Sequence, residues 1–311
     1  MMSGETDKRK NVIEISNLKK AYGDVRAVDD ISFAVKEGEF FAFLGLNGAG
    51  KSTTINIICG VINKDAGKVF VDGVDLDQDA MSFRSKIGVV YQESALDKSL
   101  SVKDNLENRA SLYGIFNQDF EKRLNEIDEL LDIKGILKKT FGKLSGGQKR
   151  KVDIARAMIH NPKILILDEP TTGLDPQTRR TVWQALEAIQ KQFGTTIFLT
   201  THNMEEVTDA HNIVILDGGK IVAQGSPLEL KNQFTGDFIR LYHADEKQVK
   251  KLGLPYETLP ECYKIEVKNT REATQLILQH PDVFQDYEIT KGKIDDVFLA
   301  VTGKKLNEVS K

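Results

Sequence analysis

The segment Gly45–Thr53 constrains the fold of this chain more than any other part of the sequence. It reads Gly-Leu-Asn-Gly-Ala-Gly-Lys-Ser-Thr, which matches the P-loop pattern G-x-x-x-x-G-K-S/T. The apolar run Phe40–Leu44 precedes it and the largely apolar run Thr54–Cys59 follows, so the sequence predicts a strand, a glycine-rich loop and a helix. Glycines let backbone N–H groups turn towards a phosphate chain, and the helix N-terminus adds a partial positive charge. The pattern therefore predicts an α/β fold with a nucleotide site.

The residues of this loop have separate predicted tasks. Lys51 is predicted to neutralise the outer phosphates, and the hydroxyl of Ser52 is predicted to ligate Mg²⁺. The remaining predicted nucleotide contacts in the loop are Gly45, Asn47, Gly48, Ala49, Gly50 and Thr53.

Composition and charge narrow the class of protein. The chain has 311 residues, 43 of them basic and 46 acidic, and its net charge of −3 gives no reason to expect a nucleic-acid partner. Its two cysteines, Cys59 and Cys262, are far apart in sequence, so no disulfide framework is expected. No apolar run reaches the roughly 18 residues that span a bilayer, and the polar N-terminus does not resemble a signal peptide. We therefore expect a cytoplasmic protein whose membrane role, if any, depends on a partner.

Polar or glycine residues follow directly after several apolar runs that read as strands. The runs end at Leu44, Tyr91, Leu167 and Thr200, and the groups that follow them are the P-loop, Gln92, Asp168 with Glu169, and His202. Ligands of open α/β sheets bind outside the carboxyl ends of the parallel strands. We therefore expect these groups to lie at one edge of a mostly parallel sheet.

These side chains suit the chemistry of a phosphate chain at that edge. Asp168 is predicted to hold Mg²⁺ directly or through water, and Glu169 is predicted to orient or deprotonate an attacking water. Gln92 is predicted to bridge Mg²⁺, water and a moving subdomain through its amide, as both a metal ligand and a catalytic residue. His202 is predicted to hydrogen-bond the terminal phosphate.

A second predicted helix start offers another anion site. The segment Leu144–Gln148 reads Leu-Ser-Gly-Gly-Gln, in which Ser145 is predicted to cap a helix while Gly146 and Gly147 leave its first N–H groups unobstructed. The P-loop already accounts for one phosphate chain. The sequence therefore carries a second anion-binding helix end besides that of the P-loop.

Together these segments resemble the ATP-binding subunit of an ABC transporter. The motifs occur in family order between about residues 12 and 230, as the P-loop Gly45–Thr53, Gln92 of the Q-loop, the signature Leu144–Gln148, the Walker-B segment Ile164–Asp168 with Glu169, the D-loop Gly173–Asp175 and the switch residue His202. Tyr22 matches the aromatic residue that stacks on adenine in this family. The resemblance implies ATP and Mg²⁺ as ligands, and it identifies Asp175 as a further nucleotide contact.

The resemblance also implies how the two anion sites work together. In this family two ATP-binding domains form a head-to-tail pair, in which the loop Ser145–Gln148 of one chain closes over the γ-phosphate that Lys51 holds in the other. The partner is then a second copy of the chain or a paralogous ATPase. Hydrolysis, with Glu169 as the general base, releases the pair and drives a membrane partner.

Residues from Gln92 onward indicate a branch of the family. The segment Gln92–Val102, followed by Leu106 and Leu112–Gly114, resembles the drug-resistance ATPases typified by daunorubicin exporters. The resemblance implies a separate ABC-2 type permease and a peripheral location at the inner face of the cell membrane through that permease. We therefore expect the ATP-binding and ATP-hydrolysing subunit of an exporter.

The expected domains are a flexible N-terminus (1–11), an ABC ATPase domain (12–234) and a C-terminal accessory domain (235–311). The ATPase domain is expected to combine a P-loop NTPase core, N-terminal antiparallel strands and a helical subdomain at about 95–160. From Gly236 the pattern reads strand, helix, strand, strand, helix, strand, which is typical of a small ferredoxin-like α+β domain. The segment Ile294–Gly303 is either an element of the branch or simply a helix that packs on the ATPase.

Other functions are compatible with a P-loop. A regulatory GTPase needs an Asn-Lys-x-Asp segment, and Asn63–Ala66 departs from it at the fourth position. DNA-repair and ribosomal ABC proteins typically carry long insertions, zinc-binding cysteines or a second ATPase domain, and the sequence shows none of these. A binding module without catalysis would be expected to lose Glu169. A soluble non-transport ABC ATPase is therefore the main alternative.

Overall fold

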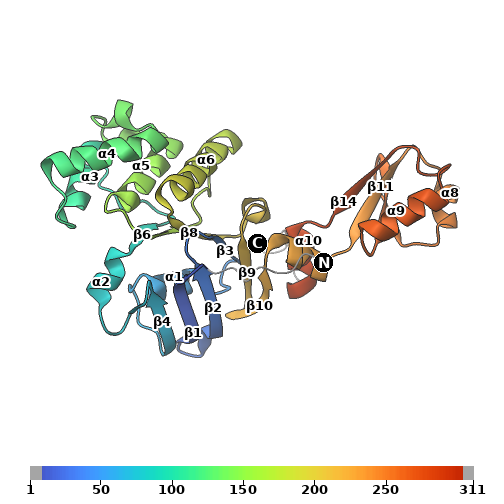
Figure 1. The fold of residues 1–311 in the computed structure, drawn as a ribbon, viewed down its shortest axis with the longest axis horizontal. Helices are drawn as coiled ribbons and strands as arrows, with labels where there is room; N and C mark the ends of the chain where they lie inside the picture. The colour runs from blue at the N-terminus through green and yellow to red at the C-terminus, as the bar shows by residue number, and fades with distance from the viewer. Residues whose placement is uncertain (1–8, 304–311) are drawn as a thin grey trace. The chain divides into compact units, whose positions relative to one another are not determined.

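The computed structural model describes residues 9–303, which form two compact units (Figure 1). The first unit ends at Ile221 and the second begins at Val222, so the boundary falls inside the strand Lys220–Gly225. Residues 1–8 of the predicted flexible N-terminus and residues 304–311 of the predicted accessory domain lie outside the described residues. The domain limits that the sequence predicts, after residues 11 and 234, stay predictions.

The chain begins with an antiparallel sheet. Its strands lie in the order β2 (Val25–Lys36), β1 (Asn11–Tyr22), β4 (Ala66–Val71) and β5 (Val74–Asp75). β4 and β5 form a hairpin, and its turn residues Asp72 and Gly73 have left-handed φ values of 49° and 77°. Such a turn matches the right-handed twist of the strands, which is why Asp-Gly is a strong hairpin signal. The predicted N-terminal antiparallel sheet is confirmed.

A second sheet carries the predicted site residues at its edge. Its strands lie in the order β10 (Lys220–Gly225), β9 (Asn212–Asp217), β3 (Phe40–Leu44), β8 (Thr196–Thr201), β7 (Ile164–Asp168) and β6 (Ile87–Val90). The pairs β3–β8, β3–β9, β7–β8 and β6–β7 are parallel, so the carboxyl ends of these strands share one edge. β3 and β8 are buried along their whole length, as strands covered on both faces are. The predicted mostly parallel sheet is confirmed.

An aromatic cluster joins the two sheets of the first unit. Between ring centroids, Phe33 of β2 lies 5.5 Å from Phe41 and 5.3 Å from Phe43 of β3, and 6.2 Å from Phe198 of β8. Full burial of a phenylalanine side chain contributes about 1.5–3 kcal/mol. α1 (Lys51–Ile58) buries its isoleucines in the same core, so packing fixes the helix that follows the P-loop.

The first unit contains several helices, some of which lie between β6 and β7 in the sequence. The helices of the first unit are α1, α2 (Ala80–Ser85), α3 (Val102–Ser111), α4 (Asn117–Leu131), α5 (Gly146–Met158) and α6 (Pro176–Phe193), with short 3-10 helices at Lys134–Ile136, Phe141–Lys143 and Met204–Val207. α3, α4 and α5 lie together, so the insertion is helical, as the sequence predicts (Figure 1). α3 starts at a capping box formed by Ser101 and Asp104. α4 buries an apolar face that includes Phe120 and Ile127.

The second unit is an α+β fold with its own core. Its elements are α7 (Pro227–Phe234), β11 (Asp237–Tyr242), α8 (Glu246–Lys251), β12 (Tyr256–Thr258), β13 (Cys262–Val267), α9 (Thr270–Gln279), β14 (Tyr287–Lys291) and α10 (Ile294–Thr302). The antiparallel sheet has the order β12-β13-β11-β14, and α9 packs on it (Figure 1). The predicted order of strands and helices from β11 to β14 is confirmed. The segment Ile294–Gly303 contains α10, which packs against α7.

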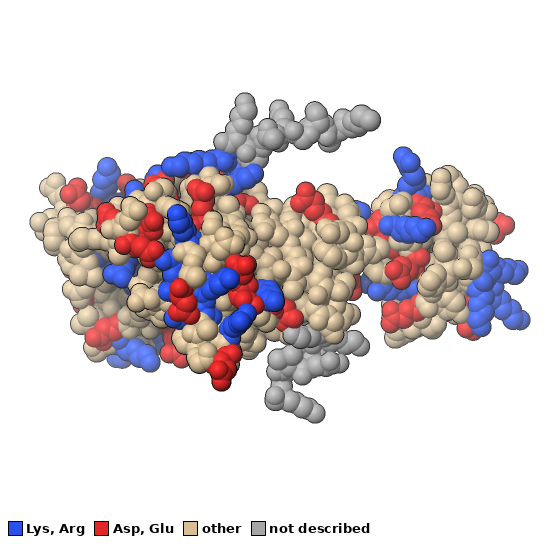
Figure 2. Space-filling model, turned by 90° about the horizontal axis from the view of Figure 1, so that it is seen from below, with Lys and Arg blue, Asp and Glu red and all other residues tan. Residues whose placement is uncertain are grey.

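Charged side chains of both signs are interspersed on the surface of the first unit. The face drawn in Figure 2 shows basic and acidic side chains beside one another. Ion pairs such as Lys20–Asp65 at 2.7 Å and Lys163–Asp72 at 2.8 Å join opposite charges in this unit. Among residues 9–303, the helices are too short or too polar to cross a membrane.

Candidate nucleotide-binding site

The P-loop takes a conformation that requires glycine at particular positions. Gly50 has a φ of +105°, and a Cβ there would lie 2.3 Å from the carbonyl oxygen of Ala27. Gly48 has a φ of +81°, and a Cβ at Gly45 would meet the carbonyl oxygen of Leu216 at 2.8 Å. Among the described residues no side chain caps the start of α1, so its first N–H groups stay available to an anion.

Lys51 is buried inside the loop, with 5% of its surface exposed. Its Nζ donates to the carbonyl oxygens of Gly45 at 2.7 Å and Leu46 at 3.2 Å, and it lies 3.7 Å from Oε1 of Glu169. Burial lowers the pKa of Lys51, while the negative charges of Glu169 and Asp168 act in the opposite direction. A phosphate at this point would stabilise the buried ammonium further.

Asp168, Glu169 and His202 meet at the carboxyl ends of β7 and β8. Oε1 of Glu169 lies 3.1 Å from Nδ1 of His202, and the hydroxyl of Thr200 donates to Oδ1 of Asp168 at 2.5 Å. Glu169 has a φ of +47°, a left-handed conformation that is uncommon for a residue with a Cβ. Its N–H donates to the carbonyl oxygen of Thr200 at 3.1 Å. The structure thus brings these three side chains to the edge where Lys51 lies.

Gln92 follows β6 at the same edge, with an exposed side chain. Its carbonyl oxygen lies 3.4 Å from Nη2 of Arg150, which also reaches the carbonyl oxygen of Glu169 at 3.4 Å. Sequence reasoning missed Arg150 because it lies in the basic run Lys149–Lys151, and such runs are usually solvated. Its position one helical turn before the buried Ile154 is the signal that could have found it.

The oxygen donors at this edge suit Mg²⁺. Ser52 has an exposed residue surface at the start of α1, Asp168 has a carboxylate at the end of β7, and Gln92 offers an amide oxygen. Mg²⁺ usually binds through one or two carboxylates together with substrate phosphates and waters. Within the described part of the chain, no cluster of three or more His, Cys, Asp and Glu side chains is built to hold a metal alone. The donor set therefore fits a metal that arrives with phosphate.

The aromatic residue Tyr22 is open to a ligand. It lies at the end of β1 with 52% of its surface exposed, and Nζ of Lys20 lies 5.5 Å from the ring centroid. An exposed aromatic ring can stack on a nucleobase. In the P-loop, Asn47 and Gly48 are exposed, Thr53 is half-buried and Ala49 is buried.

The predicted signature residues form a separate cluster. Oγ of Ser145 accepts from the N–H of Gln148 at 3.3 Å, and Oε1 of Gln148 accepts from the N–H of Ser145 at 3.2 Å. This capping box starts α5 as predicted. Asp175 caps α6 by accepting from the N–H of Thr178 at 3.0 Å, and a Cβ at Gly147 would meet Cγ2 of Thr178 at 2.5 Å. The members of this cluster are Ser145, Gly146, Gly147, Gln148 and Asp175.

The two clusters are distinct within one chain. A cleft of about 370 Å³ opens beside the signature, lined among others by Ser145, Gly147 and Thr178. Among the described residues that line it, none belongs to the P-loop. The structure therefore gathers Lys51, Asp168, Glu169, His202 and Gln92 at the sheet edge, and it gathers the signature and D-loop residues elsewhere.

A basic groove lies beside the Q-loop. It has a volume of about 490 Å³, and Arg84, Arg109 and Arg156 line it together with Tyr91 and Tyr113. Its described lining contains no Asp or Glu. Because Tyr91 directly precedes Gln92, this groove adjoins the sheet edge at which Gln92 lies.

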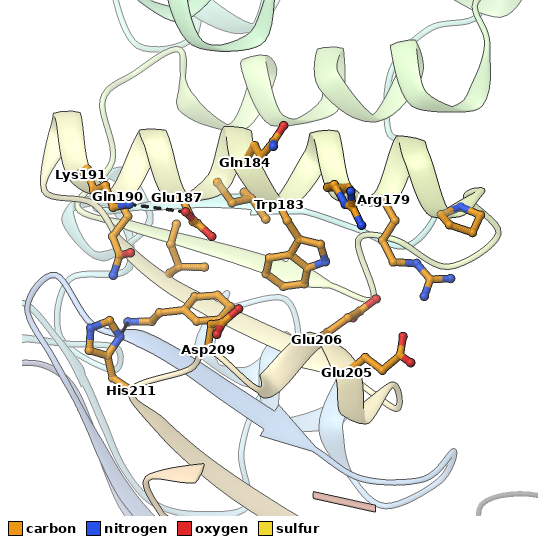
Figure 3. Close-up of a pocket in the computed structure, with 15 residues that line it drawn as sticks. Arg179, Trp183, Gln184, Glu187, Gln190, Lys191, Glu205, Glu206, Asp209 and His211 are labelled. Atoms are coloured by element: carbon orange, nitrogen blue, oxygen red, sulfur yellow. Dashed lines mark hydrogen bonds and ion pairs between the residues drawn. The ribbon is translucent and has the colours of Figure 1, made fainter. Parts of the chain in front are cut away.

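A larger cavity of about 850 Å³ lies between α6 and the short helix Met204–Val207. The ring of Trp183 points from α6 into it, with Glu205 and Glu206 on the opposite side (Figure 3). Trp183 packs edge-on against Phe40, with ring centroids 5.5 Å apart. The described residues that line the cavity include none of the predicted nucleotide contacts.

Comparison with known proteins identifies the family. A family model described as ABC transporter matches residues 28–172. The chain is 35% identical over 310 residues to a Nod factor export ATP-binding protein I of Rhizobium etli, which covers 95% of each chain. It is 33% identical over 303 residues to the daunorubicin resistance ATP-binding protein DrrA2 of Streptomyces coeruleorubidus, covering 93% of this chain and 94% of the relative.

Solved structures agree with these relatives. A dimeric structure of the bacterial ABC transporter cassette MJ0796 is similar with a TM-score of 0.63 at 30% identity, over 69% of this chain and 98% of that one. The same cassette has also been solved in a post-hydrolysis state bound to ADP and Pi. The chain therefore belongs to the ABC transporter family, as an ATP-binding subunit of its drug-resistance branch that hydrolyses ATP.

Proposed function

We propose that this chain powers an exporter as one half of a head-to-tail ATPase dimer, coupled to a separate ABC-2 type permease at the inner face of the cell membrane. The observation that carries this proposal is that two clusters with predicted anion sites lie apart within one chain. Lys51 and Glu169 lie at the sheet edge, whereas the exposed helix start at Ser145 belongs to another cluster. A second copy completes each site if its signature loop faces the P-loop of the first. The dimeric ABC cassette and the relatives named for export support this arrangement.

The sheet edge supports a mechanism in which nucleotide binding releases the general base. The phosphates of ATP bind to the Lys51 ammonium and to the free N–H groups of α1. Glu169 then loses its 3.7 Å ion pair with Lys51, because the more highly charged phosphates compete for the same ammonium. Its carboxylate becomes free to accept a proton from the attacking water. His202, 3.1 Å from Glu169, is placed to hydrogen-bond the terminal phosphate.

Other residues complete the proposed nucleotide site. Ser52, Asp168 and Gln92 would hold Mg²⁺, which supplies positive charge to the outer phosphates. Tyr22 stacks on adenine through its exposed ring. The Ser145 helix end of the second copy adds a partial positive charge from the opposite side and excludes water.

The basic groove beside the Q-loop supports the permease part of the proposal. Its three arginines lie next to Tyr91 with no acidic side chain among the described residues of the lining, so it suits an acidic segment of a partner. Such a contact would act on the proposed catalytic edge through Gln92, which directly follows Tyr91. Co-purification from detergent-solubilised membranes is the test, and a chain that always purifies without a permease would favour a non-transport ABC ATPase.

The Glu169→Gln variant of the full chain tests the dimer. We expect it to bind ATP and to form an ATP-dependent dimer on size exclusion, because the amide leaves the phosphate contacts of Lys51 in place. Turnover should fall by about 10²–10⁴-fold, the usual contribution of a general base.

Lys51→Ala is the matched control for this experiment. It removes the buried ammonium and should abolish both ATP affinity and the dimer. A Glu169→Gln variant that binds ATP but stays monomeric at every protein concentration would contradict the head-to-tail arrangement.

A further inference from the structure

A buried guanidinium connects the two catalytic loops of this cassette. Arg150 on α5 is 7% exposed, and its Nη1 donates to the carbonyl oxygen of Tyr91 at 2.8 Å. Its Nη2 lies 3.4 Å from the carbonyl oxygen of Gln92 and 3.4 Å from that of Glu169. The planar guanidinium of Arg150 thus contacts the backbone of the segment that follows β6 and of the segment that follows β7.

The same face of α5 holds the Q-loop at further points. Asp153, three residues after Arg150, accepts from Oγ of Ser94 at 2.5 Å, and Arg156 donates through Nη2 to the carbonyl oxygen of Val89 at 2.6 Å. Residues at i and i+3 lie on one side of a helix. The segment Val89–Ser94 is therefore bound along one row of α5 side chains, and Gln92 lies in its middle.

These hydrogen bonds satisfy carbonyl groups that are partly buried. A guanidinium offers five donors in a rigid plane, and hydrogen bonds from a charged donor are stronger than those between neutral groups. A lysine at this position would keep the charge but could not span three acceptors. Loss of Arg150 would leave the carbonyl oxygens of Tyr91, Gln92 and Glu169 without this donor.

Glu169 depends on such backbone hydrogen bonds more than a residue in a common backbone conformation does. Its φ of +47° is held by the N–H of Glu169, which donates to the carbonyl oxygen of Thr200, and by the carbonyl group that faces Arg150. Residues in sparsely populated backbone conformations persist where the surroundings over-determine them. Without Arg150, the carbonyl group of Glu169 loses this hydrogen-bond donor.

We propose that Arg150 is a positioning residue that holds Gln92 and Glu169 at fixed positions relative to the Ser145 end of α5. The proposal rests on the roles proposed above for Glu169 and Gln92. Because α5 starts at Ser145, a movement of that helix end on engaging a second copy reaches both catalytic loops through a single side chain. Arg150 itself lies on the loop backbones and touches neither reacting group.

Steady-state ATP hydrolysis and ATP affinity of the full-length chain test this role. We expect Arg150→Ala to lower kcat between about ten- and a hundredfold, as displacement of a catalytic group by about 1 Å does. The dissociation constant for ATP should stay within about twofold, because the contacts of Lys51 and the P-loop are unchanged. Arg150→Lys should recover part of kcat, since it keeps one charged donor towards the carbonyl oxygen of Tyr91.

Arg123 provides the matched control. It is 9% exposed and donates to the carbonyl oxygen of Met158 at 2.9 Å and to Oδ1 of Asn161 at 3.1 Å, away from the catalytic loops. Arg123→Ala should lower the unfolding midpoint as Arg150→Ala does, yet leave kcat within about twofold of the wild type.

The outcomes separate this inference from the proposed function. A wild-type kcat in Arg150→Ala, or an equal loss of kcat in Arg150→Ala and Arg123→Ala, overturns the positioning role. If Arg150→Ala does not fold, Arg150→Lys decides: a several-fold lower kcat at unchanged ATP affinity supports the role, and a wild-type kcat overturns it. Wild-type turnover in Glu169→Gln would instead contradict the proposed function.

Discussion

Burial decides the charge state of single side chains in the helical part of the cassette. The ring of His160 stacks on Tyr113 with centroids 3.9 Å apart, and its Nε2 lies 3.2 Å from the carbonyl oxygen of Ile87. Burial lowers the pKa of His160 to about 4, and the charge of Arg109 acts in the same direction. The folded protein therefore keeps this imidazole neutral at a pH where an exposed histidine is protonated.

This burial predicts a loss of stability in mild acid. The pKa of His160 is lower in the folded state than the value of about 6.5 in the unfolded chain, so the unfolded chain binds more protons as the pH falls from about 6.5 to 4. Between pH 7.5 and 5.0 we expect the wild type to lose about 2 kcal/mol more free energy of unfolding than His160→Phe. Urea denaturation at both pH values measures the difference, and equal losses in the two proteins would contradict the prediction.

Short local sequence patterns set the first residue of several helices. α3, α5 and α7 each begin with a serine whose hydroxyl accepts from the N–H three residues later, at Ser101, Ser145 and Ser226. The three helix starts share one local chemistry. Only the surroundings of Ser145 give its helix end a proposed role in binding, because an exposed cleft adjoins it.

The cap of α3 gives a prediction at this scale. Ser101→Ala removes the acceptor for the N–H of Asp104 and should lower the free energy of unfolding by about 1 kcal/mol. Ser111→Ala, in the last turn of the same helix, should change it by less than about 0.5 kcal/mol, because its hydroxyl donates to the carbonyl oxygen of Asn108 on an exposed surface. Equal midpoints for the two variants in urea would show that the cap contributes nothing.

The whole molecule contains separate hydrophobic cores. The first unit packs around its phenylalanine rings, and the second packs around Ile239, Leu241, Ile265 and Phe284. Proteins built from separate domains need not unfold in a single transition. A nucleotide that binds only in the first unit would raise the stability of that unit alone.

Phe284→Ala tests whether the units unfold separately. Phe284 is 4% exposed, and its loss should destabilise the second unit by about 3–5 kcal/mol while the ATP-dependent transition keeps its midpoint. Differential scanning calorimetry with and without ATP and Mg²⁺ resolves the transitions. Leu278→Ala, at a site on α9 that is 74% exposed, is the control and should leave both midpoints in place. A joint shift of both transitions by Phe284→Ala would show that the units unfold together.

Sequence reasoning succeeded where the structure depends on neighbours along the chain. Hydrophobic periods and residue types within a few positions account for the buried strands β3, β7 and β8. They also account for the Asp72-Gly73 turn and for the caps at Ser101 and Ser145. Alternation predicts strands only at Val12–Ile15 and Ile31–Val35, whereas β1 and β2 run for 12 residues each. Irregular register in this pair breaks the alternation on which the prediction relied.

By itself the sequence determined the P-loop, the signature helix start and the gathering of polar groups at one sheet edge, because motif spacing and parallel strands suffice for these. Tertiary structure alone decided the order β10-β9-β3-β8-β7-β6, the ion pair of Lys51 with Glu169, and the burial of Arg150 across both catalytic loops. Each of these joins segments that are distant along the chain. Such contacts form only when the whole core packs, and no local period records them.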